Sequence, residues 1–105
     1  MILDEVITGF GRLGHAFAAE RYRLKPDMIC FAKGVTNGAA PLSGVLVSRE
    51  IYNAHMQGPM HRVELFHGHT YAGHPLSVAA ALAALEVYRT EELFARTRGL
   101  EPAFA

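Results

Sequence analysis

Short apolar runs of strand length alternate with segments of helical pattern along this chain. Three runs are expected to form strands, over residues 2–3, 28–31 and 44–48. Helices are expected over residues 15–23, 49–56 and 75–89, with another beginning in 91–98. Strands that alternate with helices predict an α/β fold with a mainly parallel sheet flanked by helices. In such sheets ligands bind beyond the carboxyl ends of the strands.

The chain has a higher apolar and a lower charged content than a typical soluble domain. Of its 105 residues 50% are hydrophobic and only 19% are charged, whereas about a quarter are charged in a typical soluble domain. The predicted helix 75–89 places Val78, Leu82 and Leu85 on one face and Ala84 and Val87 on the other. A helix that is apolar on nearly all sides is buried inside a large core. We therefore expect residues 1–105 to be part of one larger domain, truncated at both ends.

Charge and composition exclude several classes of protein. The formal net charge is zero, so the basic patch of a nucleic-acid binder is not expected. The apolar and aromatic content excludes a disordered chain, and no apolar run reaches the roughly 18 residues of a membrane span. Cys30 is the only cysteine, which excludes an internal disulfide and disfavours secretion. A cytoplasmic enzyme is the expectation that remains.

A glycine-rich loop matches the fingerprint of dinucleotide-binding folds. Gly9, Gly11 and Gly14 have the required spacing between a strand and a short helix. The acidic residue expected about 20 residues later should end a second strand, but Asp27 precedes that strand. A dinucleotide-binding module therefore stays open as an alternative.

Four histidines gather in the segment before the long helix. These are His61, His67, His69 and His74. A His-x-His pair on a strand can bind a metal. Cysteine is absent around these histidines and Glu64 is the only nearby acid, so we expect no metal site and instead hydrogen bonds to backbone or a partner chain.

Asp4 and Lys33 are the polar residues that stand out at strand ends. Asp4 ends the first predicted strand, and Lys33 follows the second, just before Gly34. A lysine removed from water can act as a nucleophile or base and form Schiff bases with carbonyls. An ordinary lysine exposed at a strand end fits these few residues equally well.

Four ordered motifs resemble the class III pyridoxal-phosphate (PLP) aminotransferases. Residues 3–14 are similar to the aspartate segment of that family, and residues 26–34 to the segment with its cofactor lysine. Residues 41–45 and 67–75 complete the set in the same order. The resemblance covers essentially the whole chain. Within the family, the four motifs are most similar to those of the omega-amino acid–pyruvate aminotransferases.

This resemblance implies part of the large domain of a fold-type I PLP-dependent enzyme, with a role for each matching residue. Lys33 is implied to hold PLP as a Schiff base, in a buried setting that favours the neutral amine, and to shuttle a proton during catalysis. Asp4 is implied to pair with the pyridine nitrogen, and Val6 to pack on the face of the ring. Thr70 is implied to donate a hydrogen bond to the cofactor phosphate of a neighbouring subunit, which makes a homodimer necessary.

The implied reaction moves an amino group from an amine or omega-amino acid to a keto acid such as pyruvate. Other parts of the family's site lie outside these residues, so the chain alone is expected to be inactive. An aminomutase or another PLP enzyme with the same aspartate and lysine is an alternative, and so is a purely structural or interaction role.

Overall fold

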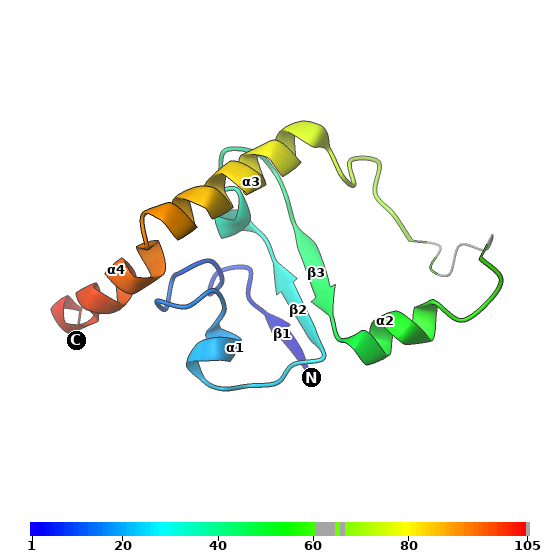
Figure 1. Cartoon of the computed structure of the whole chain (residues 1–105), viewed down its shortest axis with the longest axis horizontal. Helices are drawn as coiled ribbons and strands as arrows, with labels where there is room; N and C mark the ends of the chain where they lie inside the picture. The colour runs from blue at the N-terminus through cyan, green and yellow to red at the C-terminus, as the bar shows by residue number, and fades with distance from the viewer. Residues whose placement is uncertain (61–64, 66, 105) are drawn as a thin grey trace.

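A three-stranded sheet forms the centre of the molecule. The computed structural model (Figure 1) describes residues 1–60, 65 and 67–104. The strands β1 (Ile2–Asp4), β2 (Met28–Phe31) and β3 (Gly44–Val47) lie in the order β1-β2-β3. β1 and β2 pair in parallel, whereas β2 and β3 pair antiparallel.

The sheet of the described residues is therefore mixed, where a mainly parallel sheet was expected. The connection from β2 to β3 contains only the short 3-10 helix η1 (Lys33–Val35). A parallel pair requires a crossover of a dozen or more residues, usually through an α-helix. Without that helix the chain reverses, and β3 returns alongside β2 in the opposite direction.

In the part of the chain that the structure describes, five further helical segments accompany the sheet. They are α1 (Ala18–Arg21), α2 (Arg49–His55), α3 (Pro75–Thr90), α4 (Leu93–Leu100) and the 3-10 helix η2 (Glu101–Ala103). α3 and α4 follow one another along one side of the molecule, and α2 extends from the far end of β3 (Figure 1). The bounds of α2 and α3 match the predicted helices to within one residue. Ser48 caps α2, because its hydroxyl accepts a hydrogen bond from the Ile51 N–H at 3.4 Å.

Two predicted helices begin later than expected, for separate reasons. The helix predicted from residue 15 starts at Ala18, because residues 15 and 16 pair with the glycine-rich loop instead. Their carbonyl groups accept hydrogen bonds from the Gly11 and Phe10 N–H groups. The last helix starts at Leu93 because Glu92 adopts a left-handed backbone conformation, with φ of 48°. That conformation separates α4 from α3.

The described residues enclose very little apolar core. Only three apolar residues among them are buried, namely Ala19, Val35 and Ala81. The radius of gyration is 16.0 Å, whereas a compact domain of this length has about 13 Å. β2, predicted to be covered on both faces, is half-buried, and Leu82 of α3 is 64% exposed. No helix in the described part of the chain is long and apolar enough to cross a membrane.

Candidate functional site

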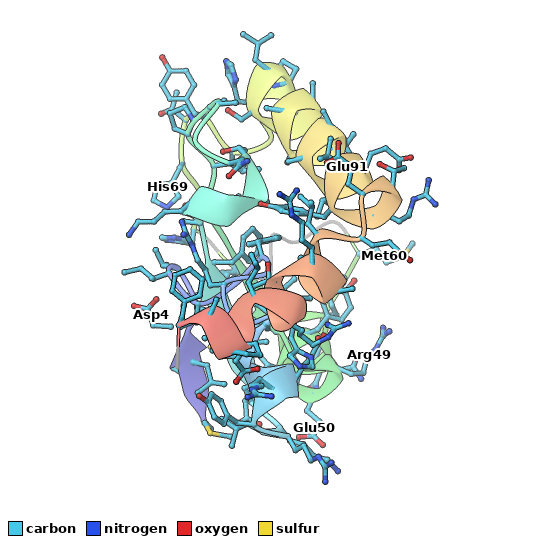
Figure 2. All side chains as sticks on the ribbon, turned by 90° about the vertical axis from the view of Figure 1, so that its left-hand side faces the viewer. Asp4, Arg49, Glu50, Met60, His69 and Glu91 are labelled. Carbon is cyan, nitrogen blue, oxygen red and sulfur yellow. The ribbon has the colours of Figure 1, made fainter. Side chains whose placement is uncertain are left out.

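Asp4 and Lys33 lie at the carboxyl ends of two neighbouring parallel strands. Asp4 pairs in register with Cys30, and Lys33 follows three residues after Cys30 along the chain. The Asp4 carboxylate is exposed, points outward from the ribbon (Figure 2), and accepts a hydrogen bond from the Val6 N–H at 3.1 Å. Parallel pairing therefore brings the two predicted residues to the same edge of the sheet, with the half-buried Val6 just beyond Asp4.

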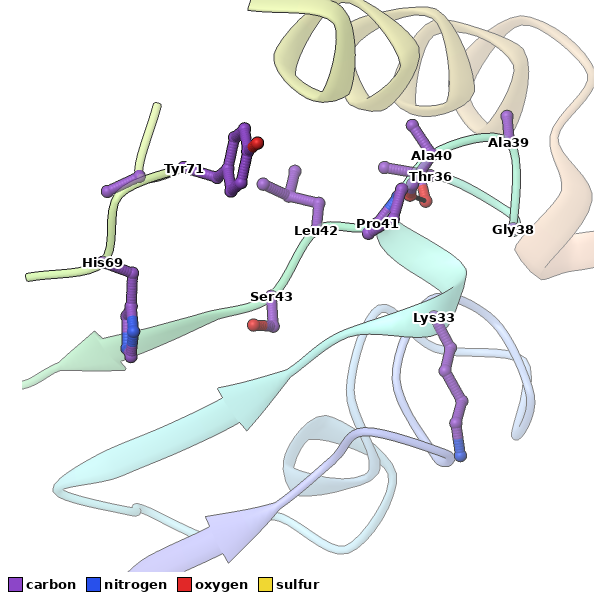
Figure 3. Close-up of a pocket in the computed structure, with 11 residues that line it drawn as sticks. Lys33, Thr36, Gly38, Ala39, Ala40, Pro41, Leu42, Ser43, His69 and Tyr71 are labelled. Carbon is purple, nitrogen blue, oxygen red and sulfur yellow. Dashed lines mark hydrogen bonds between the residues drawn. The ribbon is translucent and has the colours of Figure 1, made fainter. Parts of the chain in front are cut away.

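Lys33 begins the η1 turn with an unusual backbone conformation. Its φ is 46°, in the left-handed region that residues with a Cβ rarely adopt. The side chain runs away from Pro41 and Leu42, toward the segment that follows β1 (Figure 3). Lys33 is exposed, which differs from the buried lysine that the resemblance implied. The apolar strand before it is itself only half-buried, so the described residues do not remove the amine from water.

A cavity of about 620 Å³ lies between the Lys33 loop and the segment before α3. Lys33, Thr36 and Ser43 line it from one side, and His69 and Tyr71 from the other (Figure 3). Thr70 stands between His69 and Tyr71 in sequence, but it is exposed and is not among the lining residues. Asp4 and Val6 do not line this cavity either. The cavity thus joins the loop of Lys33 to the segment of Thr70 without bringing all four predicted residues together.

Glu5 is the organising residue that the sequence analysis missed. Its side chain is only 1% exposed, and its carboxylate accepts three hydrogen bonds. The donors are the Thr8 hydroxyl at 2.7 Å, the Ala18 N–H at 2.6 Å and the Ala19 N–H at 2.8 Å. A buried carboxylate is tolerated only when its oxygens are satisfied in this way. Glu5 therefore folds the glycine-rich loop back onto the strand end that presents Asp4.

The same contacts overturn the dinucleotide alternative. A dinucleotide pyrophosphate binds the free N–H groups at the start of a helix that follows the glycine loop. Here those groups belong to Ala18 and Ala19 of α1, and both donate to Glu5. α1 has only four residues, and the carboxylate already occupies the position of a phosphate. The glycines instead allow a close turn, since Gly11 has φ of 97°.

The histidines do not form a metal centre in the described part of the chain. His61 lies outside the described residues. The rings of His67 and His69 meet edge to face, with centroids 5.1 Å apart. Among residues 1–60, 65 and 67–104, no three ligating side chains come together.

Comparison with known proteins identifies relatives along the whole chain. The sequence model of the family described as Aminotransferase class-III matches residues 1–105. The chain is 58% identical over 101 residues to an omega-aminotransferase of Caulobacter vibrioides. The aligned residues make up 96% of this chain and 23% of that protein. It is 45% identical over 106 residues to an omega-amino acid–pyruvate aminotransferase of Pseudomonas putida, covering 99% of this chain and 24% of that protein.

A solved structure agrees with these sequence relatives. The taurine:2-oxoglutarate aminotransferase of Bifidobacterium kashiwanohense, determined in complex with PLP and glutamate, superposes with a TM-score of 0.89 at 42% identity. The superposition covers 99% of this chain and 22% of that chain. The chain thus spans about a quarter of the length of the curated relatives it matches. Both the resemblance and the assignment as an α/β portion of a PLP-dependent fold are confirmed: the chain belongs to the class-III aminotransferase family.

Proposed function

We propose that the protein containing this chain is a PLP-dependent aminotransferase that moves an amino group from an amine or omega-amino acid to a keto acid such as pyruvate. The observation that carries the proposal is the arrangement of Asp4 and Lys33 at the ends of two paired parallel strands. A carboxylate and a primary amine stand at one sheet edge, in a chain that a class-III model matches throughout. In this proposal residues 1–105 form part of a larger PLP-binding domain.

The residues present fit PLP by their chemistry. Among the described residues neither Asp4 nor Lys33 takes part in an ion pair, so both charged groups are available to a ligand. Lys33 supplies the amine for a Schiff base with the cofactor aldehyde, and Asp4 an acceptor for a protonated ring nitrogen. When bound, PLP supplies an electron sink that stabilises a carbanion on the substrate.

The protein's own groups control proton position around that chemistry. With PLP bound, the Asp4 carboxylate would hold a proton on the ring nitrogen through a charge-assisted hydrogen bond. The Lys33 amine would act as the general base and acid that takes up and returns a proton at the reacting carbon. Val6 would pack against the cofactor ring, and the Thr70 hydroxyl would donate a hydrogen bond to the cofactor phosphate.

Thr70 leads us to propose a homodimer. Thr70 is exposed on the segment 67–74 and does not line the cavity beside Lys33. A hydroxyl offered from a neighbouring subunit explains why the same chain need not bring Thr70 to its own Lys33. We also propose that the dimer works in the cytoplasm on small amines and keto acids.

An amino-transfer assay on the full-length protein tests this function. With pyruvate and a set of omega-amino acids, we expect alanine to appear together with an equal amount of the donor's carbonyl product. Lys33→Ala should abolish both products, whereas exchange of the exposed Lys25 for alanine should leave them unchanged. Movement of the amino group within one molecule, without alanine, would indicate an aminomutase and contradict the proposal.

A further inference from the structure

The backbone at Lys33 is held in place by residues far away in the sequence. Lys33 adopts its left-handed conformation immediately before Gly34. A non-glycine residue keeps such a conformation only where the surrounding structure fixes it, and residues of this kind cluster at functional sites. The contacts that fix this turn therefore also determine the direction of the Lys33 side chain.

The carbonyl group of Gly34 receives one of these contacts. It accepts a hydrogen bond from the Tyr88 hydroxyl of α3 at 2.7 Å, in addition to one from the Asn37 N–H at 3.2 Å. Gly34 also meets Phe10, whose Cβ lies 2.7 Å from the position that a Gly34 Cβ would take. The residue after the lysine is thus held from α3 by Tyr88 and from the glycine-rich loop by Phe10.

Tyr88 is itself fixed by neighbouring rings. It stacks on Phe10 with centroids 6.3 Å apart, and on Phe94 with centroids 5.5 Å apart. Burial raises the pKa of the Tyr88 hydroxyl, although the charge of Arg12 opposes this effect. The group therefore remains a protonated donor through the physiological range. The packing of its ring and the protonated state of its hydroxyl both favour the hydrogen bond to the Gly34 carbonyl.

We propose that Tyr88 is a positioning residue for Lys33: by binding the Gly34 carbonyl it holds the left-handed turn and so orients the lysine side chain toward the cofactor. The inference rests on the proposed function, since it assumes that Lys33 carries PLP. Tyr88 reaches the lysine through Gly34 and need not touch the cofactor or the substrate.

The test uses the full-length protein stripped of PLP, and follows how fast Lys33 takes the cofactor up again. Tyr88→Phe removes one hydroxyl and keeps the ring, so it should fold. We expect uptake, read from the visible absorbance band, to be about fivefold slower, the factor expected from one lost hydrogen bond. The pH midpoint of that band should also shift, because the bond between lysine and cofactor is held at another angle. The exposed Tyr52 of α2, replaced by Phe, is the matched control.

A second variant separates positioning from stability. Phe94→Leu keeps the hydroxyl of Tyr88 but removes a ring that packs on it, so it should lower the melting temperature more than Tyr88→Phe while slowing uptake less. If uptake simply follows stability, so that Phe94→Leu slows it more than Tyr88→Phe does, or if neither variant slows it, the inference is wrong.

The two proposals fail in different ways. If PLP does not attach to Lys33 in the unaltered protein, the proposed function is wrong. If it attaches there, and Tyr88→Phe matches the unaltered protein in uptake rate and pH midpoint, only the role of Tyr88 is wrong.

Discussion

Two regions of this chain differ in how their side chains are satisfied: the surroundings of Asp4 and Lys33, here called the strand-end region, and the helix α3, here called the helical region. Around Asp4 and Lys33, hydrogen bonds within the chain satisfy the polar groups, with Glu5 binding three donors and Tyr88 binding Gly34. Along α3, by contrast, large apolar side chains such as Leu76 and Leu82 face solvent, at 72% and 64% exposure. The polar groups at the strand ends are thus satisfied within the chain, whereas the described residues leave the apolar face of α3 in solvent. Substitutions in the two regions should differ accordingly.

The largest effect on catalysis outside Lys33 is expected at Asp4. Asp4→Asn keeps the size of the side chain but removes the charge that, in the proposed function, holds a proton on the ring nitrogen. We expect kcat to fall about a hundredfold, the scale for losing one preorganised electrostatic contact, with a smaller change in PLP affinity. The exposed Glu50 of α2, exchanged for glutamine, serves as control. Equal losses of kcat and PLP affinity would mean that Asp4 contributes only to binding PLP and not to catalysis.

Glu5 should dominate stability in the strand-end region. Glu5→Ala leaves the Ala18 and Ala19 N–H groups without their acceptor, and unsatisfied buried groups are costly. We expect the free energy of unfolding of the full-length protein in urea to fall by about 3 kcal/mol. Glu20, exposed and bound to the Ala16 N–H at 3.2 Å, is the matched control as Glu20→Ala. Similar stability of the two variants would show that the buried carboxylate is dispensable.

Leu82 tests the helical region, where a smaller effect is expected. If other parts of the full-length protein cover α3, Leu82→Ser should lower the free energy of unfolding by about 2 kcal/mol. Arg89→Ala on the same helix removes an exposed ion pair with Glu86 and should leave the melting temperature unchanged. If Leu82→Ser is as harmless as Arg89→Ala, that face of α3 stays in solvent and the contrast between the two regions disappears.

Local patterns were sufficient for most elements of the fold. The apolar run before Lys33 forms β2, Pro75 begins α3, and Asp4 ends β1. Each of these depends on residues within a few positions, through hydrophobic periodicity or the preference of proline for the first helical turn. Local patterns also place Asp4 and Lys33 each at the end of a strand, whereas their arrangement at one sheet edge depends on the parallel pairing of β1 with β2.

The features that sequence reasoning missed depend on contacts between distant residues. In the sequence Glu5 is simply the residue after Asp4, and only the position of α1, 13 residues away, makes it a buried cap. Tyr88 lies 54 residues from the carbonyl it binds. The exposure of Lys33 likewise depends on packing that no short pattern encodes, whereas the antiparallel return of β3 follows from a connection that contains no α-helix. The one available signal for Glu5 was an acid between a strand and a glycine-rich turn.

Identification of the lysine that carries PLP tests the account most directly. Borohydride reduction of the full-length holoenzyme, followed by protease digestion and mass spectrometry, fixes the cofactor on the residue that holds it. We expect the pyridoxyl group on the peptide that contains Lys33, and its loss in Lys33→Ala. A pyridoxyl group on another lysine, such as the exposed Lys25, would contradict the central claim.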